Sequence, residues 1–495
     1  MKNTLLIILS VLINITGFSQ NDGDIDTTFT SPYSYAGNIF GIQVQSDGKI
    51  ILINSSNNSV VRLNNDGTFD NTFTPAYTNG ILYCVKLLTD GKILIGGNFT
   101  TCNGQNANRV VKLNSNGSID NTFQINSATI TGGAVYAIEV QPDGKVLIGG
   151  SFYDQSSLSN SWFKYFLRLN INGQIDSSAS NYLHVFRANA PIHSIKYQSI
   201  YNTTSGTYDS KILLGGEFTN YANSNKGIVR INGNDCYPDN SFNAQLTKGS
   251  YAGKVSTIEL DIDGYIMAGG SFSNYNWQSS ANPGINVNNL VRLDPITGAL
   301  ASNNFSANFV NTLFQTTEIE SIAVQNDRKV LIGGYYTNSS LNSDISKFTR
   351  LNESGNIDGT FNTGTGFNNP SGNSSVNVVK LQSDGKILVG GYFRNYNGTE
   401  NFHISRLKGT STLSTNDFSK NKITLYPNPT KDFLNFTLLE TNAAITYEIN
   451  NLLGEKVSYG DLNTNSISVS DLANGVYIIK VKTNEGVFTS KFIKE

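Results

Sequence analysis

Short stretches in which apolar and polar residues alternate recur along most of the chain, and each leads through a polar turn into an aliphatic run. Residues 136–141 are a clear example, because alternation with period two over six residues predicts a strand with one buried face. The turn Asp143-Gly144-Lys145 follows, and an Asp-Gly centre suits a tight hairpin. Residues 146–150 are then aliphatic, end in Gly-Gly and precede Phe152, which predicts a second strand.

This pattern occurs seven times, so most of the chain is one unit repeated. The turns start at Asp47, Asp90, Asp143, Asp209, Asp263, Asp327 and Asp384, which lie 43 to 66 residues apart. A repeat with this period determines the whole architecture and therefore has to be interpreted first.

Each unit continues with two further predicted strands. The third carries Arg or Lys followed by Leu or Ile and then a polar residue, as in Lys112-Leu113-Asn114, and the fourth is clearest at residues 119–123. Four-stranded antiparallel meanders arranged radially form a β-propeller, so we predict an all-β, seven-bladed β-propeller over residues 20–409.

The ends of the repeat region predict that the ring closes. A fourth-strand sequence at residues 25–29 precedes the first unit, whereas the last unit stops after Arg406-Leu407 with no fourth strand of its own. The N-terminal strand can therefore complete the seventh sheet and leave no unpaired edge. The alternative, an open solenoid, requires polar caps that the sequence does not show.

The repeat resembles a known one. The patterns Gly-x-Ile-Asp-x-x-Phe, Val-Gln-x-Asp-Gly-Lys-Ile-Leu-Ile-Gly-Gly-x-Phe and Arg-Leu-Asn are similar to the delta-60 repeat, of the DUF5122 type, found in bacterial secreted proteins. The resemblance covers about residues 21 to 410 and weakens in the fourth and sixth copies, where Ser210 and Arg328 replace the turn glycine. It implies a propeller and export, and it implies no catalytic residue.

The N-terminus predicts secretion. Met1-Lys2, an apolar run from Leu5 to Ile15 and small residues before Gln20 are typical of a signal peptide, here residues 1–19. The run is too short to favour a transmembrane helix, and no other segment could span a membrane.

The C-terminal residues change in composition. Residues 410–422 are rich in Ser, Thr, Asn and Lys without strand periodicity and predict a linker, and residues 423–495 predict a small β-sandwich. This module resembles a type A sorting domain of the type IX secretion system. The residues that carry the resemblance are Tyr426, Pro427, Asn428, Pro429, Gly454, Gly475, Tyr477 and Lys491. The resemblance implies handling by the type IX secretion machinery, passage through the periplasm and delivery to the surface or medium of a Gram-negative cell. An ordinary accessory sandwich is the alternative.

Composition and charge narrow the range of partners. Charged residues make up 15% of the chain and the net charge is −2, so no basic surface for nucleic acid or anionic membrane is expected. Three cysteines give no even disulfide framework. Cys84 and Cys102 fall in one unit, so either a single bridge or inert thiols fits the sequence.

Residues with catalytic or metal-binding chemistry are sparse. His184, His193 and His403 lack the spacing of zinc ligands, and no nucleophile motif is present, so we expect neither an enzyme nor a cofactor. One acidic position of the fourth strand recurs in five places, which favours a structural ion pair over catalysis. These residues are Asp26, Asp70, Asp120, Asp176 and Asp358. Residues 64–70 cluster oxygen donors, and Asx turns explain them, with calcium as the alternative.

The remaining candidates for function lie in the variable loops. In a meander, the tight turns share one end of the ring, which we call the turn face. The connections between second and third strands and the crossings between units share the other end, the loop face. Aromatic residues among Asn and Gln are suited to sugar stacking or protein contacts. The candidate binding residues are Tyr153, Trp162, Tyr221, Tyr275, Trp277 and Tyr396. We therefore expect a secreted or surface-displayed protein that binds glycan or protein, with an extracellular polysaccharide hydrolase or lyase, or a purely structural component, as the alternatives.

Overall fold

The computed structural model is built from β-strands. It describes residues 22–33, 37–125, 130, 132–153, 164–176, 178, 188–202, 207–219, 226–276, 278–282, 284–301, 305, 318–335, 347–370, 372–409, 424–437, 446–451, 456–461, 466–483 and 486–495. The chain divides into two compact units, Met1–Thr410 and Ser411–Glu495. The predicted signal peptide and the predicted linker lie outside the described residues.

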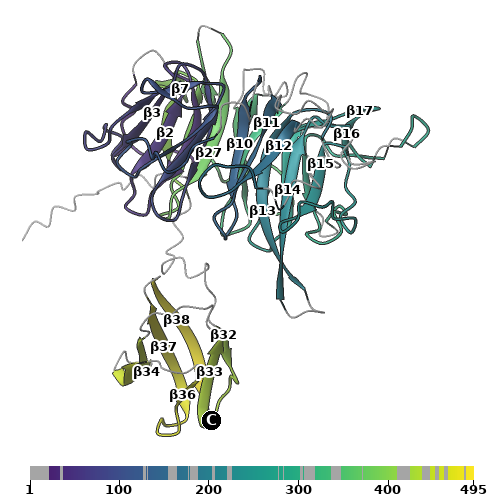
Figure 1. Ribbon diagram of the computed structural model, residues 1–495. Helices are drawn as coiled ribbons and strands as arrows, with labels where there is room; N and C mark the ends of the chain where they lie inside the picture. The colour runs from purple at the N-terminus through teal and green to yellow at the C-terminus, as the bar shows by residue number, and fades with distance from the viewer. Residues whose placement is uncertain are drawn as a thin grey trace, which may run out of the picture. The chain divides into compact units, whose positions relative to one another are not determined.

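The first unit contains, within its described residues, seven antiparallel sheets built on the same three-strand core. The first strands are β1 (Ile39–Val44), β5 (Leu82–Leu87), β10 (Val135–Val140), β13 (Ile192–Asn202), β18 (Lys254–Leu260), β23 (Glu318–Val324) and β27 (Ser375–Leu381). The second strands are β2 (Ile50–Asn54), β6 (Ile93–Gly97), β11 (Val146–Tyr153), β14 (Thr207–Gly216), β19 (Ile266–Ser271), β24 (Val330–Tyr335) and β28 (Ile387–Tyr392). The third strands are β3 (Ser59–Leu63), β9 (Val110–Leu113), β12 (Lys164–Leu169), β15 (Ile228–Asn232), β22 (Leu290–Leu293), β25 (Phe348–Leu351) and β31 (Ile404–Leu407). Figure 1 shows these sheets as neighbours, with β13 and β14 forming a long hairpin.

The sheets form a ring through their first strands. Each first strand contacts that of the next sheet, and β27 contacts β1 in turn. We call these seven the inner strands. The predicted all-β propeller is confirmed.

The fourth strand of each sheet is shorter than the sequence pattern predicts. It is reduced to one bridge, such as that between Leu113 and Ile119. The next residue, Asp120, still donates its backbone N–H to Lys112, but its carboxylate then accepts hydrogen bonds from Thr122 at the backbone and the hydroxyl. This Asx-type turn redirects the chain before a longer ladder can form.

The N-terminal segment fills the fourth position of the last sheet. Ile25 forms a bridge with Leu407, and Asp26 donates its backbone N–H to the Arg406 carbonyl at 2.8 Å. The predicted closure of the ring by an N-terminal strand is therefore observed.

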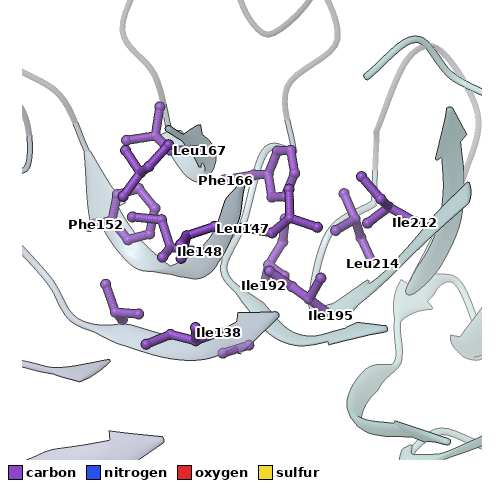
Figure 2. Packing of buried hydrophobic residues seen from close by; sticks show 14 of the residues in the cluster. Ile138, Leu147, Ile148, Phe152, Phe166, Leu167, Ile192, Ile195, Ile212 and Leu214 are labelled. Carbon is purple, nitrogen blue, oxygen red and sulfur yellow. The ribbon is translucent and has the colours of Figure 1, made fainter. Parts of the chain in front are cut away.

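The Gly-Gly pair of the repeat is explained by close packing in two directions. A Cβ atom on Gly149 would lie 2.7 Å from Ile192 of the next inner strand, and one on Gly150 would lie 1.9 Å from the Ala134 carbonyl oxygen. Figure 2 shows the apolar side chains that fill the resulting junction, among them Ile148 and Ile195. Only residues without a Cβ allow neighbouring sheets to approach this closely.

Further short strands lie in the connections at the loop face. They are β4 (Ala76–Tyr77), β7 (Thr101–Cys102), β8 (Gln105–Asn106), β16 (Leu246–Lys248), β17 (Tyr251–Ala252), β20 (Asn274–Tyr275), β21 (Ile285–Asn286), β26 (Phe367–Asn368), β29 (Asn395–Tyr396) and β30 (Thr399–Glu400). In two of these groups a crossing strand pairs with a hairpin from the following loop, as β16 does with β20 and β26 with β29. Parts of the predicted variable loops are therefore ordered by local sheet pairing.

The second unit contains two small sheets, as expected for a sandwich. One orders β32 (Thr424–Tyr426), β33 (Phe433–Thr437) and β36 (Ser466–Ser468), and the other β35 (Lys456–Asp461), β34 (Thr446–Asn451), β37 (Gly475–Thr483) and β38 (Gly486–Lys494). Leu434, Ile449, Ile467, Ile479 and Phe492 form the core between them.

Candidate functional site

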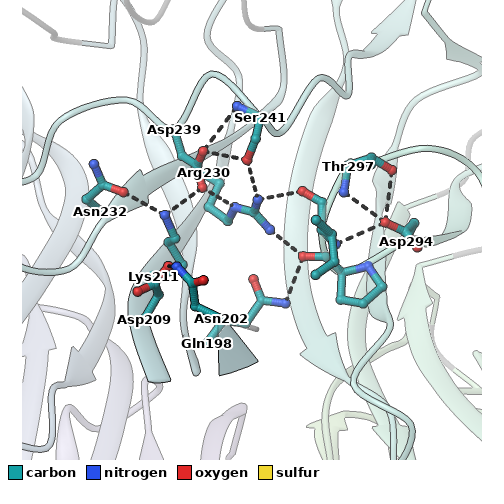
Figure 3. Close-up of polar contacts among 12 residues, drawn as sticks. Gln198, Asn202, Asp209, Lys211, Arg230, Asn232, Asp239, Ser241, Asp294 and Thr297 are labelled. Carbon is teal, nitrogen blue, oxygen red and sulfur yellow. Dashed lines mark hydrogen bonds and ion pairs between the residues drawn. The ribbon is translucent and has the colours of Figure 1, made fainter. Parts of the chain in front are cut away.

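The repeated carboxylates act as structural clamps between sheets. In Figure 3, Arg230 donates from Nε to Asp239 at 2.9 Å and from its terminal nitrogens to the carbonyls of Pro295 and Ile296, which lie in the next unit. Its guanidinium also lies 4.8 Å from the ring centre of Phe242. One side chain thus joins the third strand, the fourth position and the neighbouring turn.

The same arrangement recurs around the ring. Arg62 reaches the Ser115 carbonyl, Arg168 the Gly233 and Asn234 carbonyls, and Arg406 the Asn65 carbonyl. Arg350 reaches the carboxylate of Asp22. These contacts support a structural role for the aspartate that recurs in the fourth strand.

These contacts also hold the carboxylates ionised. Burial alone would raise the pKa of Asp26, but the hydrogen bonds from Thr28, the charge of Arg406 and a hydrogen bond from Lys386 lower it to about 2. Asp358 behaves in the same way, with its pKa lowered to about 2. Groups that are charged at neutral pH and fully engaged in ion pairs are poor proton donors or acceptors.

Two of the predicted binding aromatics are structural instead. Tyr275 and Tyr396 are 7% and 1% exposed, and their hydroxyls donate to the carbonyls of Gly298 and Gly23. They lie in β20 and β29, whose pairing with crossing strands buries them. This burial leaves little side-chain surface for a ligand, and ligand contact by these two residues stays a prediction.

Of the other four predicted aromatics, the structure describes Tyr153 alone. Tyr153 ends β11 and is half-buried beside Gly132, where an added Cβ would lie 2.1 Å from its ring. Trp162, Tyr221 and Trp277 lie outside the described residues. Tyr153 remains an untested candidate.

A different set of side chains gathers near the loop-face end of the inner strands. In every inner strand the pairing with the second strand skips one residue, which forms a β-bulge. The skipped residues are Phe40, Tyr83, Tyr136, His193, Ser256, Glu320 and Asn377, and we call them the bulge ring. All seven are half-buried. Bulges re-aim side chains and are frequent beside functional sites.

One arc of the bulge ring is aromatic. The ring centres of Phe40 and Tyr83 lie 5.9 Å apart, those of Tyr83 and Tyr136 5.1 Å, and those of Tyr136 and His193 5.0 Å with nearly parallel planes. His193 Nε2 lies 2.8 Å from the Glu217 carboxylate. Four rings from four consecutive sheets therefore form a continuous surface.

The opposite arc is polar and charged. Lys254 forms an ion pair with Glu318, which also accepts a hydrogen bond from Ser256 at 2.7 Å. Burial and the negative charge of Glu318 raise the pKa of Glu320 to about 7. Burial would also raise the pKa of Glu318, but Lys254 lowers it.

Comparing the seven inner strands in the sequence could have located this ring. The flanking positions stay small or apolar, as in Ile39-Phe40-Gly41 and Val135-Tyr136-Ala137, while the skipped position changes from aromatic to acidic between copies. Because we assigned function to the loops, we missed this position.

The structure shows how the three cysteines and the oxygen-rich residues 64–70 are accommodated. Cys84, Cys102 and Cys236 are free, and burial raises the pKa of the Cys102 thiol to about 11. In residues 64–70, Asp66 accepts hydrogen bonds from the backbone and hydroxyl of Thr68. Within the described residues, no group of three or more His, Cys, Asp or Glu side chains is placed to hold a metal ion.

Several of the sorting-domain residues lie beside β38 at one edge of the sandwich. Asn428 accepts a hydrogen bond from the Ile493 backbone and donates to the Lys491 carbonyl, while Gly475 pairs with Lys494 and Tyr477 with Phe492. Tyr426 ends β32, Pro427 and Pro429 are exposed in the turn that follows, and Gly454 lies outside the described residues. The first and last motifs of this domain are thus joined by hydrogen bonds.

Family comparisons agree with this architecture. A model described as a domain of unknown function (DUF5122) β-propeller matches residues 45–73, 88–123, 141–178, 209–242, 325–361 and 382–413, and a secretion system C-terminal sorting domain matches residues 424–495. The chain carries DUF5122 propeller repeats and a secretion sorting domain. The unit around Asp263 is not among the matched segments, and in this unit Ala301 occupies the aspartate position and donates its N–H to Arg292.

The sorting domain establishes the destination. Proteins with this domain are handled by the type IX secretion machinery and reach the surface or surroundings of a Gram-negative cell, which confirms the predicted export. No helix in the described part of the chain has the length and apolar character needed to cross a membrane.

Solved structures give only distant likenesses. The extracellular domain of the putative one component system BT4673 from B. thetaiotaomicron is 12% identical with a TM-score of 0.43, over 96% of this chain and 58% of that one. Virginiamycin B lyase from Staphylococcus aureus is 13% identical with a TM-score of 0.42, over 75% and 94%. YCF48 from Cyanidioschyzon merolae is 12% identical with a TM-score of 0.40, over 76% and 97%. The chain therefore spans little more than half of the BT4673 domain, and at these TM-scores none of the three bears on its activity. None of the curated proteins matches this chain.

Proposed function

We propose that this exported propeller is a glycan-binding protein and that the glycan lies on the bulge ring at the loop face. The observation that carries the proposal is the division of this ring into an aromatic arc and a polar arc. Aromatic faces stack on the C–H faces of sugar rings, and carboxylate and amide groups hydrogen-bond to sugar hydroxyls. A ligand with both kinds of surface fits this arrangement better than a purely apolar or purely charged one.

The rim above the polar arc adds two more aromatic side chains. Tyr335 lies opposite Glu318 in the β23–β24 ladder and is 37% exposed, and Tyr392 lies opposite Ser375 and is 39% exposed. Exposed aromatics beside hydrogen-bonding groups extend the area that a sugar chain could contact. These residues replace Tyr275 and Tyr396 as the binding candidates.

One observation favours a second candidate, an enzyme that cleaves polysaccharide. Glu318 and Glu320 both lie in β23, and their surroundings push their pKa values in opposite directions. A pair of this kind can supply an acid and a base at neutral pH. His193 of the bulge ring forms a further pair with Glu217, which follows β14.

A glycan array and polysaccharide-degradation assays on the purified protein distinguish these functions. Binding without turnover, lost in Tyr136→Ala and retained in the matched Tyr208→Ala, supports the binding protein; Tyr208 is 68% exposed and lies outside the ring. Release of products that is abolished by Glu320→Gln, with binding intact, supports the enzyme instead. Failure of every glycan to bind would overturn both proposals and leave a protein ligand or a structural role.

A further inference from the structure

Two junctions of the ring lack the arginine clamp, and each of them contains a cavity on the turn face. At the junction of the second and third units, Lys112 stands where the other clamps have arginine, and no donor in the described residues bonds to the Ile171 carbonyl. At the junction of the fifth and sixth units, Arg292 is drawn to Asp261 at 2.6 Å instead of reaching the next turn. Lysine cannot reproduce the two-pronged contact of a guanidinium, so the space between turns stays open.

The two cavities occupy equivalent places in the repeat. One measures about 480 Å³ and includes Leu88, Lys112 and Ile171, and the other measures about 360 Å³ and includes Asp261, Arg292 and Glu353 at the corresponding positions. The missing arginine contact therefore accounts for both cavities. The residues that line each cavity determine which ligands it can hold.

The larger cavity has apolar walls. Leu88 stands where Gln45 and Gln141 stand in the neighbouring units, and Ile171 replaces the polar turn residue and is 66% exposed. Further walls come from Leu94, Phe123, Val140, Pro142, Val146 and Tyr197. A volume of this size with mostly apolar walls and a few polar groups is typical of small-molecule sites.

The lysine side chains around this cavity are already paired, and the Asp90 carboxylate, which also lines it, accepts a hydrogen bond from the Lys92 backbone at 3.0 Å. Lys86 is paired with Glu139, and Lys112 lies 3.5 Å from Asp120, which also binds Lys92 at 2.9 Å. An anionic ligand would lose hydration without gaining an unpaired cationic partner. Asp90 is exposed to solvent, so its charge is screened and offers a cationic ligand little. The Ile171 carbonyl offers an acceptor that an arginine occupies at other junctions.

We propose that the cavity between the second and third units is a binding site for an uncharged ring compound with a hydrogen-bond donor. It is separate from the bulge ring, because its residues lie around the turns of the second and third units, with Tyr197 of β13 beside them, and not at the loop face. The two sites can therefore be tested independently.

The test uses N-phenyl-1-naphthylamine, an uncharged fluorescent probe with two aromatic systems and one N–H group. We expect saturable binding of one probe per chain to the full-length protein. Lys112→Arg with Leu88→Gln installs the residues of the neighbouring units and should weaken binding at least about tenfold, which corresponds to roughly 1.4 kcal/mol. Ile171→Ser should also weaken binding, and Ile357→Ser, which changes a 51% exposed residue of another unit, should not.

The converse variant is expected to gain a binding site, and a gain of binding cannot be explained by misfolding. Arg62→Lys with Gln45→Leu should open the same space between the first and second units and raise the stoichiometry toward two. Circular dichroism checks that each variant is folded. Absence of saturable binding to the wild type, or equal affinity in the wild type and the Lys112→Arg/Leu88→Gln variant, would overturn the proposal.

Discussion

Arg406 donates a hydrogen bond from Nε to the Asp26 carboxylate at 2.8 Å, although 380 residues separate the two in the sequence. Both side chains are almost fully buried, and Arg406 also reaches the Asn65 carbonyl in the first unit. A single guanidinium therefore connects the N-terminal segment, the last sheet and the first sheet.

Asp26→Asn tests this closure. Removing one partner of a buried ion pair leaves an uncompensated charge, so the free energy of unfolding should fall by about 3 to 5 kcal/mol at pH 7 in urea titrations. The pKa of Asp26 is lowered to about 2, so the stabilisation is complete above its unfolded pKa of about 3.9 and is lost as pH falls toward 2. The difference between variant and wild type should shrink in that window.

Asp263→Asn is the matched control. Its closer partner Arg328 is 54% exposed and Asp263 itself 37%, and its contact with the buried Arg292 is a longer one of 3.4 Å, so this substitution should cost no more than about 1 kcal/mol. Equal effects of the two substitutions would show that the ring does not depend on the Asp26 pair.

The second glycine of the repeat predicts a steric effect. A Cβ atom on Gly97 would lie 2.1 Å from the Ile81 carbonyl oxygen, and backbone cannot move aside as a side-chain tip can. Gly97→Ala should therefore lower the free energy of unfolding by about 3 kcal/mol or more. Gly359→Ala, where nothing lies within 4 Å, should be neutral or slightly stabilising in the same assay.

Tyr396→Phe separates a structural role from a binding role. The hydroxyl donates to the Gly23 carbonyl at 2.6 Å, so its loss should cost about 1 kcal/mol of stability and leave ligand binding unchanged. Tyr251→Phe, at a residue 76% exposed, should change neither property. Weakened ligand binding at unchanged stability would restore Tyr396 as a contact residue.

Glu320→Gln should change how stability depends on pH. The folded-state pKa of Glu320 is raised to about 7 from an ordinary value near 4.5, so the carboxyl favours the folded state fully below pH 4.5 and this contribution is lost as pH rises through 7. Glutamine stays neutral, so the variant should melt at a higher temperature than wild type at pH 8 and at a similar temperature at pH 4.5. Parallel melting curves across this range would contradict the assignment of a raised pKa.

The scaffold could be predicted because its determinants are local. The Asp-Gly turns, the alternating inner strands and the Gly-Gly pairs each specify structure within about ten residues, and their repetition specifies the ring. The shortened fourth strand was missed because the side chain of Asp120 competes for backbone donors, which a hydrophobic pattern does not reveal.

The site could not be predicted from loop composition. Tyr275 is buried because β20 pairs with β16, which precedes it by more than twenty residues, and no local pattern shows this pairing. The bulge ring depends on register, since His193 and Glu320 are re-aimed by one skipped residue in each strand. Register is set by tertiary contacts as well as by the alternation of side chains.

Because residues 25 and 26 close the ring, the propeller can be completed only in a chain that extends as far as Leu407. The partners of these residues are Leu407 and Arg406, which are among the last residues of the propeller to be synthesised. Until they arrive, the N-terminal strand has no partner, and a chain that ends early leaves an open sheet edge. The sorting domain begins shortly after Leu407, so a chain that carries the export signal also carries everything needed to seal the ring.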